Sequence, residues 1–334
     1  MSDLLTLPKL TGFPDLTWRA ARLEDAAAIR QLSKAAVAID ELEAPQPVEE
    51  IEQVFALLGD EAATDSLLAL DADGNVAAMA FVFMLPPNED ERLIRLGGSV
   101  HVKHRGRGIG TYLMTWMEAR ARQKVAGTDD GLITRALINC REQHTDRITL
   151  FEQQGFRATR YFYKMKRDLM QPIPKKTLLP ELTLITWTPD LDMETREAFN
   201  KSFRDHFGFA PFEPEMWQQL VSGGPHFRGD LTYLAQNEDG QVVGFLVSEI
   251  DESRNVGRDK SEAIMGQIGV IRGWRKQGIA SALIAEAMRA YRVAGIDYAV
   301  LGVDTENPSG ALRLYENLGF EAVQRSIAFE KELT

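Results

Sequence analysis

Short apolar runs and stretches with helical spacing alternate along the chain, and their order occurs twice. The first half predicts a strand at 16–20, helices at 23–37 and 48–58, and a hairpin over 66–85. The second half predicts a strand at 182–187, helices at 194–207 and 213–221, and a hairpin over 232–250. Both hairpins carry Asp-Gly at the turn, at Asp73-Gly74 and Asp239-Gly240, which is typical of tight β-turns.

A short strand, a turn of small residues and a long helix follow each hairpin. In the second half the strand covers 263–271, the turn is Arg275-x-x-Gly278-x-Ala280, and Leu283, Ala287 and Tyr291 recur on one helix face. The first half repeats the turn as Arg105-x-x-Gly108-x-Gly110. Because the first N–H groups of a helix lack partners within it, each turn is predicted to bind a diphosphate. The Gly-Lys-Ser/Thr and G-x-G-x-x-G phosphate motifs fit neither turn.

The two halves are an internal repeat. Phe151, Gly155 and Phe156 match Tyr315, Gly319 and Phe320 at an offset of 164, whereas the turn arginines are offset by 170. The six extra residues of the first half are expected near 127–131. The segment 170–180 holds three prolines and two lysines and is predicted to be a linker. The expected domains are therefore 1–169 and 182–334, with a linker at 170–181.

The turn pattern, Gln or Arg, two residues, Gly, one residue, then Gly or Ala, resembles motif A of the GNAT N-acetyltransferase superfamily. The element order of each half is also that of this family. The resemblance covers roughly 16–168 and 182–333 and implies two tandem GNAT folds, each an α/β domain with a mixed sheet covered on both faces. The alternative is two unrelated α/β domains that share a tight turn.

The resemblance implies acetyl-coenzyme A as the ligand of both halves. In the family, backbone amides of the fourth strand and of the turn hold this molecule. The implied cofactor-binding residues in the first half are Val100, Val102, Arg105, Gly106, Arg107, Gly108, Ile109 and Gly110. Those in the second half are Ile268, Gly269, Val270, Arg275, Lys276, Gln277, Gly278, Ile279, Ala280 and Asn307.

The resemblance also places catalysis in the second half. Asn307 and Tyr315 match the family's motif B, in which a tyrosine faces the thioester sulfur, so Tyr315 is the expected general acid, although it could be a core aromatic. Glu262 and Glu249 both qualify by position as the general base, and Asp251 is a weaker third candidate. The loop after the first helix is expected to line an acceptor pocket through His206, Phe207, Phe209 and Trp217.

The first half keeps motif A but has Phe151 and Gln143 where the second half has Tyr315 and Asn307. A phenyl ring donates no proton, so this half is expected to bind the cofactor without catalysis. Cys140 and His144 lie nearby in sequence, but no motif supports either as a replacement. A lone cysteine in an apolar run is usually a small buried residue.

The composition of the chain limits the kinds of partner that it is expected to bind. The net charge of −11 argues against nucleic acid, and no apolar run is long enough for a membrane span, so a cytoplasmic protein is expected. The predicted activity is acetyl transfer to a primary amine of a small molecule. The alternatives are a regulatory or structural acyl-coenzyme A binder without turnover, and a peptide or protein N-acetyltransferase. Packing of the two halves against each other as an internal pseudo-dimer would favour a monomer.

Overall fold

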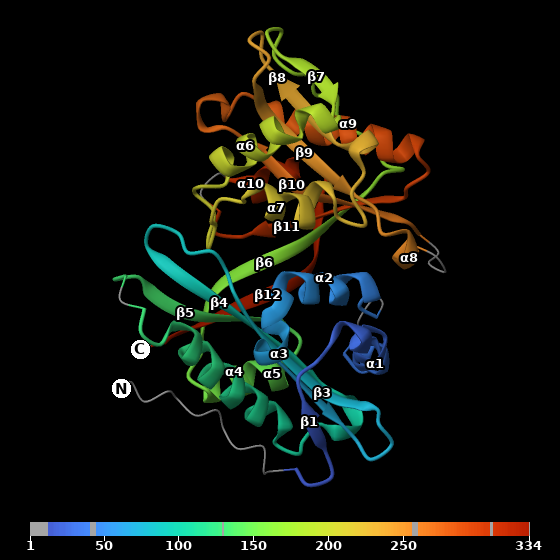
Figure 1. The fold of residues 1–334 in the computed structure, drawn as a ribbon. Coiled ribbons are helices and arrows are strands. Elements are labelled where there is room, and N and C mark those ends of the chain that lie inside the picture. The colour runs from blue at the N-terminus through green and yellow to red at the C-terminus, as the bar shows by residue number, and fades with distance from the viewer. Residues whose placement is uncertain (1–12, 41–44, 129, 256–259, 308–309, 334) are drawn as a thin grey trace. The chain divides into compact units, whose positions relative to one another are not determined.

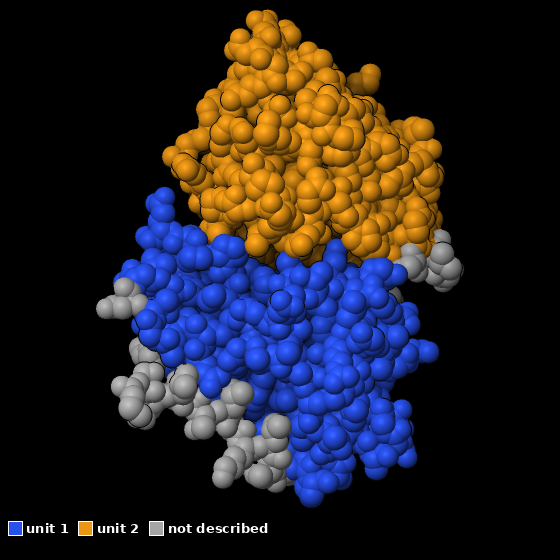
Figure 2. Space-filling view, in the orientation of Figure 1, with its two compact units in different colours: residues 1–159, 327–334 blue, residues 160–326 orange. Residues whose placement is uncertain are grey.

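The computed structural model describes residues 13–40, 45–128, 130–255, 260–307 and 310–333. These form two compact units, which Figure 2 colours separately. Unit 1 contains residues 1–159 and 327–334, and unit 2 contains residues 160–326. None of the described helices is long and apolar enough to cross a membrane.

Unit 1 is built around a mixed sheet (Figure 1). In this unit β1, β2, β3 and β4 are antiparallel neighbours, β5 joins β4 in parallel, and the end of β12 lies next to β5. Helices α1 and α4 pack on its strands. The elements are β1 (Thr17–Arg19), α1 (Ala26–Ala36), α2 (Val48–Leu58), α3 (Ala62–Asp65), β2 (Ser66–Leu70), β3 (Val76–Met84), β4 (Glu91–Val100), α4 (Ile109–Val125), β5 (Ile133–Arg141), α5 (Thr145–Gln153) and β12 (Glu321–Glu332).

Unit 2 repeats this plan. The strands β7, β8, β9 and β10 are antiparallel neighbours, β11 joins β10 in parallel, and β6 pairs with β11. The elements are β6 (Arg157–Asp168), β7 (Thr183–Thr186), α6 (Asp192–Ser202), α7 (Pro214–Trp217), β8 (Tyr233–Gln236), β9 (Val242–Glu249), α8 (Glu252–Asn255), β10 (Glu262–Val270), α9 (Ile279–Val293), β11 (Tyr298–Asp304) and α10 (Ala311–Asn317).

Apolar side chains cover both faces of the unit 2 sheet. Alternate residues of β9 point to opposite faces, so Leu246 packs with α9 and α10, whereas Phe245 and Val247 pack with α6 and α7. The α9 face predicted from helical spacing is fully buried: Leu283, Ile284, Ala287, Met288 and Tyr291 have no exposed surface. The sheet is therefore covered on both faces, as the mixed α/β class requires.

The compact units do not follow the sequence repeat to its end. Residues 160–168 of β6 belong to unit 2, where Phe162 lies opposite Asp304 and Asp168 opposite Tyr298. Residues 327–334 belong to unit 1, where the Leu333 N–H donates to Thr134 O. Each half of the sequence thus supplies the last strand segment of the other unit. The predicted linker has no regular helix or strand between 172 and 179.

Most predicted elements are present, with local differences. The helix expected over 23–37 begins with a 3-10 turn (Leu23–Asp25), and the one expected over 194–207 ends at Ser202. The helix expected over 213–221 finishes as a π-helix (Gln218–Ser222). The extra residues of the first half lengthen α4 as well as the turn that follows, where Gly127 and Gly131 have φ of 84° and 75°.

We expect Phe329→Ala to destabilise unit 1 although Phe329 lies at the far end of the chain. Its ring is 1% exposed and meets the Phe151 ring edge-on with centroids 5.5 Å apart. Removing a buried phenyl ring costs about 3–5 kcal/mol. Hydrogen exchange should quicken in α5 and β5 and stay unchanged in α9. Val323→Ala, at a half-exposed position of the same strand, is the control, and faster exchange in α9 alone would contradict the assignment of this segment.

Candidate functional site

An arginine fixes the turn after β10. The Arg275 Nε donates to Val270 O at 3.1 Å, and its two terminal nitrogens donate to Ser202 O and to the Asp205 carboxylate, both at 2.8 Å. Arg272 donates to the same carboxylate at 2.5 Å. These hydrogen bonds, from Arg275 first, hold the pKa of Asp205 below its usual value. The guanidinium of the motif arginine therefore ties the turn to β10 and to the end of α6.

Unit 1 contains the same anchor. The Arg105 Nε donates to Val100 O at 3.3 Å, and its terminal nitrogens reach both oxygens of Asp40 at 2.6 and 2.7 Å. The bond from Arg105 lowers the pKa of Asp40, which Arg147 also contacts at 3.1 Å. Arg107 pairs with Asp15 at 2.7 Å. The motif arginines, predicted from the sequence to belong to the cofactor-binding set, thus also anchor the turns to the rest of their units.

The backbone of each turn presents unpaired N–H groups. The first backbone bond of α9 runs from Ala282 N–H to Gly278 O, so the N–H groups of residues 279–281 have no partner within the helix. Gly278 has φ of 81°, and a Cβ there would meet nothing within 4 Å. In unit 1, Gly108 has φ of 83°, and the first bond of α4 runs from Tyr112 N–H to Gly108 O. Both turns can therefore hold an anion against the backbone.

The strand that precedes each turn, β4 or β10, separates from its parallel neighbour before it reaches the turn. Pairing of β10 with β11 ends at Ile264–Val300, and pairing of β4 with β5 ends at Arg95–Leu137. In unit 2 the register of β10 against β9 also shifts by one residue between Met265 and Gln267, which makes a bulge at Gly266. The β3–β4 register in unit 1 is continuous from Ala78–Val100 to Met84–Ile94. Only unit 2 therefore has a bulge where these strands part.

The Glu249 carboxylate lies beside the bulge. Glu249 is the last residue of β9 and pairs with Ile264, and its carboxylate occupies the space that a Cβ on Gly266 would need. Isolated glycines inside strands often mark such a bulge or close approach. Of the two carboxylates predicted from the sequence, Glu249 is therefore the one at the point where β10 leaves β11.

Glu262 is the first residue of β10, at the end away from the turn and two residues before Ile264, with which Glu249 pairs. Its carboxylate contacts the Lys166 Nζ at 2.5 Å and the Lys164 Nζ at 3.7 Å, and both lysines come from β6. The strand rises about 3.3 Å per residue, so Glu262 is more than 20 Å along β10 from Val270. Asp251, the third candidate, is 5% exposed with an Arg254 Nε 3.3 Å away. These placements favour ion-pair roles for both carboxylates.

Tyr315 lies in the middle of α10 and is 8% exposed. Its ring meets the Phe320 ring edge-on at 6.0 Å, and burial raises the pKa of its hydroxyl to about 12. The hydroxyl therefore keeps its proton at physiological pH. Asn307 precedes the helix, and its N–H donates to Asp304 O at 3.2 Å.

The aromatic loop of unit 2 is mostly packed into the core. Trp217 is 1% exposed, and its Nε1 donates to Asp192 at 2.8 Å, so it does not line an acceptor pocket as the sequence suggested. Phe209 packs against the apolar cluster that contains Trp217. The His206 ring stacks on Phe203 at 4.1 Å, and burial lowers its pKa. Arg160 lies 4.6 Å over the Phe207 ring and pairs with Asp304 at the end of β11.

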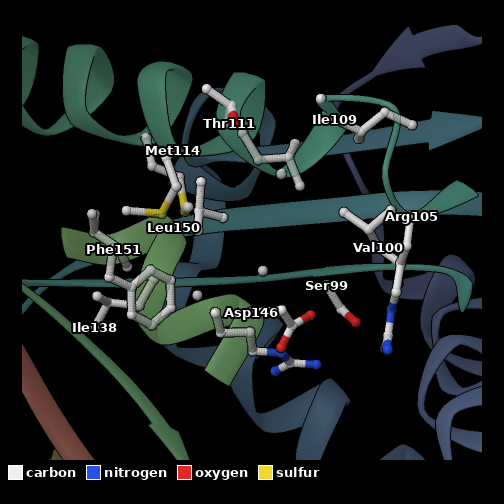
Figure 3. A pocket seen from close by; sticks show the side chains of 18 of the residues that line it. Ser99, Val100, Arg105, Ile109, Thr111, Met114, Ile138, Asp146, Leu150 and Phe151 are labelled. Carbon is white, nitrogen blue, oxygen red and sulfur yellow. The ribbon is translucent and has the colours of Figure 1, made fainter. Parts of the chain in front are cut away.

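A cavity of about 340 Å³ opens in unit 1 between the parted strands, the turn and helices α4 and α5 (Figure 3). Ser99, Arg105 and Asp146 lie at one side of it, and Met114, Leu150, Phe151 and Ile138 gather at the other. Gly106, Gly108, Ile109 and Gly110 of the predicted cofactor set are part of its lining. Nearby Cys140 is buried, and burial raises its thiol pKa to about 11, which argues against a nucleophile.

Comparison with known proteins identifies this arrangement. The profile of the Acetyltransferase (GNAT) family matches residues 31–156 and 193–320. The chain belongs to the GNAT acetyltransferase family. It is an acyltransferase with two GNAT domains in tandem, as its sequence repeat predicted.

Several relatives share this length and plan. Mycothiol acetyltransferase of Acidothermus cellulolyticus is 27% identical over 68% of each chain, and that of Thermobispora bispora is 27% identical over 89% of this chain and 92% of its own. A GCN5-related N-acetyltransferase from Sphaerobacter thermophilus has a TM-score of 0.75 and 28% identity, covering 98% of this chain and 97% of its own. A tandem GNAT protein from the clavulanic acid biosynthesis pathway, 14% identical with a TM-score of 0.66, shares the fold over 96% of this chain and 99% of its own.

Sequence reasoning missed the partners of the motif arginines and the bulge. Asp40 and Asp205 follow the first helix of each half, but nothing local distinguishes them from other acidic residues. Gly266 had a usable signal, because an isolated glycine in a strand pattern suggests a bulge. Among the described residues, no group of three side chains could hold a metal ion.

We expect Lys276→Gly to stabilise unit 2. Lys276 is the one described non-glycine residue with positive φ, at 63°, and Gly106 fills the matching position in unit 1 with φ of 74°. Such a backbone costs a side-chain residue about 1–2 kcal/mol, which glycine avoids. Chemical denaturation should report this gain. Lys276→Ala keeps the strain while removing the amine, so equal stabilisation by alanine would mean that the charge and not φ is responsible.

Proposed function

We propose that unit 2 transfers the acetyl group of acetyl-coenzyme A directly to a primary amine of a small molecule. The observation that carries this proposal is that one unit combines the β10 bulge, Glu249 beside that bulge, and a buried Tyr315 in the apolar cluster that also contains β10 residues. The relatives named mycothiol acetyltransferase favour a small-molecule acceptor. Unit 1 keeps the turn but not these three features, so we assign it binding without transfer.

The residues present suit the donor. A diphosphate would meet the N–H groups of residues 279–281 at the positive end of α9, and the glycine at 278 keeps this backbone uncovered. Gly269 leaves room on β10 for the Phe245 ring and the Ser202 hydroxyl, with which a Cβ there would collide. When bound, the donor supplies an acetyl group already activated as a thioester. Ile268, Gly269 and Val270 are the β10 residues proposed to position it.

The remaining chemistry is proton transfer. An ammonium with a pKa near 10 must lose a proton before it attacks, and the departing thiolate must gain one. Glu249, at the bulge, is proposed to take the amine proton, directly or through water. Tyr315 is proposed to donate its Oη proton to the departing sulfur, and its raised pKa keeps that proton available throughout the neutral range.

Two other functions fit parts of the structure. A protein that only binds acyl-coenzyme A would need the two turns and neither Glu249 nor Tyr315. A peptide N-acetyltransferase would need an open groove for an extended chain. A panel of small amines and short peptides, scored by thiol release with acetyl-coenzyme A, separates all three. If no acceptor raises thiol release above background hydrolysis, a protein that only binds acyl-coenzyme A would be favoured.

We expect Tyr315→Phe to lower kcat about 10²–10⁴-fold, because a positioned general acid contributes about that factor. The ring and its packing on Phe320 remain, so affinity for acetyl-coenzyme A should hardly change. Phe151→Tyr is the matched change in unit 1 and should have almost no effect. Full activity of Tyr315→Phe, together with loss of activity on disruption of the Arg105 turn, would mean that unit 1 is the catalytic unit.

We expect Glu249→Gln to lower kcat/KM most strongly at neutral pH, because glutamine keeps the shape of the side chain and cannot accept the proton. The loss should shrink as pH rises towards the pKa of the amine, where free amine becomes abundant. Glu262→Gln is the control, since it breaks the pairs with Lys164 and Lys166 without touching the bulge. A larger kcat loss from Glu262→Gln would assign the base to the other carboxylate.

A further inference from the structure

The unit 1 cavity has a polar and an apolar side. Figure 3 places Ser99, Asp146 and Arg105 at one side and Met114, Leu150 and Phe151 at the other. Leu113 and Met117 add to the apolar lining from the buried face of α4. The side with the turn suits an anion. The other side offers aliphatic and aromatic carbon to the part of a ligand that extends past the parted strands.

The counterparts of Glu249, Asp304 and Tyr315 in unit 1 are apolar residues. Strand register makes Met84 the counterpart of Glu249, because they pair with Ile94 and Ile264, which are 170 residues apart. The offset of 170 also matches Leu96 with Gly266. The offset of 164 matches Ile138 with Gly302, Cys140 with Asp304, and Phe151 with Tyr315. Against the apolar side of the unit 1 cavity, a charged amine would therefore lose its hydration without gaining a charged partner, whereas Asp146 lies at the polar side.

The ion pairs of unit 1 add a second difference. Asp40 joins Arg105 of the turn to Arg147 of α5, whose counterpart in unit 2 at the offset of 164 is Ala311. Asp40 is 8% exposed, so these three side chains form a compact cluster at the cavity. Both arginines of the polar side are thus paired with Asp40, Ser99 and Asp146 lie on the same side, and the opposite side offers a ligand apolar contact.

We propose that unit 1 binds, without turnover, a coenzyme A thioester whose acyl group is a linear aliphatic chain longer than acetyl, with about four to eight carbons. This inference rests on the proposed role of the Arg105–Gly110 turn as a diphosphate site. The acyl chain lies against Met114, Met117, Ile138 and Phe151. Two methionines suit this role, because their unbranched flexible side chains adapt to ligands of different length.

The test is calorimetry on the full chain with coenzyme A and its acetyl, butyryl, hexanoyl and octanoyl thioesters. Gly278→Val blocks the unit 2 turn and isolates unit 1, and Gly108→Val does the reverse. In Gly278→Val, each added methylene that is buried should tighten binding about four-fold. In Gly108→Val, lengthening the chain should give no such gain. Met117→Phe fills the apolar side and should abolish the dependence on chain length while coenzyme A itself still binds.

Thr115→Met, at an exposed position of the same helix, is the matched control and should keep the dependence on length. If Met117→Phe fails to fold, Met114→Phe tests the same side of the cavity. Equal affinity of Gly278→Val for acetyl and hexanoyl thioesters would overturn the inference and leave unit 1 as a coenzyme A site. Failure of Gly278→Val to bind any of the five compounds, while Gly108→Val binds acetyl-coenzyme A, would remove the proposed unit 1 turn site itself.

Discussion

The hydrogen bonds of one arginine in each unit organise the site. Arg105 and Arg275 donate through Nε to the last carbonyl of the preceding strand, at 3.3 and 3.1 Å, and through their terminal nitrogens to an aspartate that follows the first helix. Three elements are thereby joined at the point where the chain turns into a long helix. Together with backbone bonds such as Ile271 N–H to Val243 O and the buried face of α9, this link fixes the direction in which the open N–H groups of unit 2 point.

The two units share this anchor and differ at the other end of the parted strands. Unit 2 has a bulge, a carboxylate beside it and a buried phenol, whereas unit 1 has continuous register and apolar side chains in the matching places. Glu249 pairs with Ile264, six residues before the last residue of β10. Under the assignment proposed above, substitution there can remove catalysis without altering the backbone proposed to bind a diphosphate, so a repeat can keep one property and lose the other.

Local patterns were sufficient to predict most elements, because helical spacing and Asp-Gly turns act over a few residues. Leu283, Ala287 and Tyr291 marked the buried face of α9 correctly, and Gly278 marked its start. The exchange of the last strand segments could not be predicted, since residues 162–168 pair with β11, at least 130 positions away, and nothing in their sequence specifies that partner. Trp217 was assigned to a pocket for the same reason, because its bond to Asp192 depends on tertiary packing.

The cavity in unit 1 is also relevant to the different functions proposed for the two units. An enzyme site for a charged amine must desolvate the ammonium and offset that cost with a nearby carboxylate, as Glu249 can at the bulge of unit 2. The unit 1 cavity provides about 340 Å³ lined at its far side by methionine, leucine and phenylalanine, where desolvation of a charge would not be offset. The same lining favours a methylene chain. Under the assignment proposed above, unit 1 lacks both the base and the acid, and the apolar side chains in their place favour a ligand different from the amine proposed for unit 2.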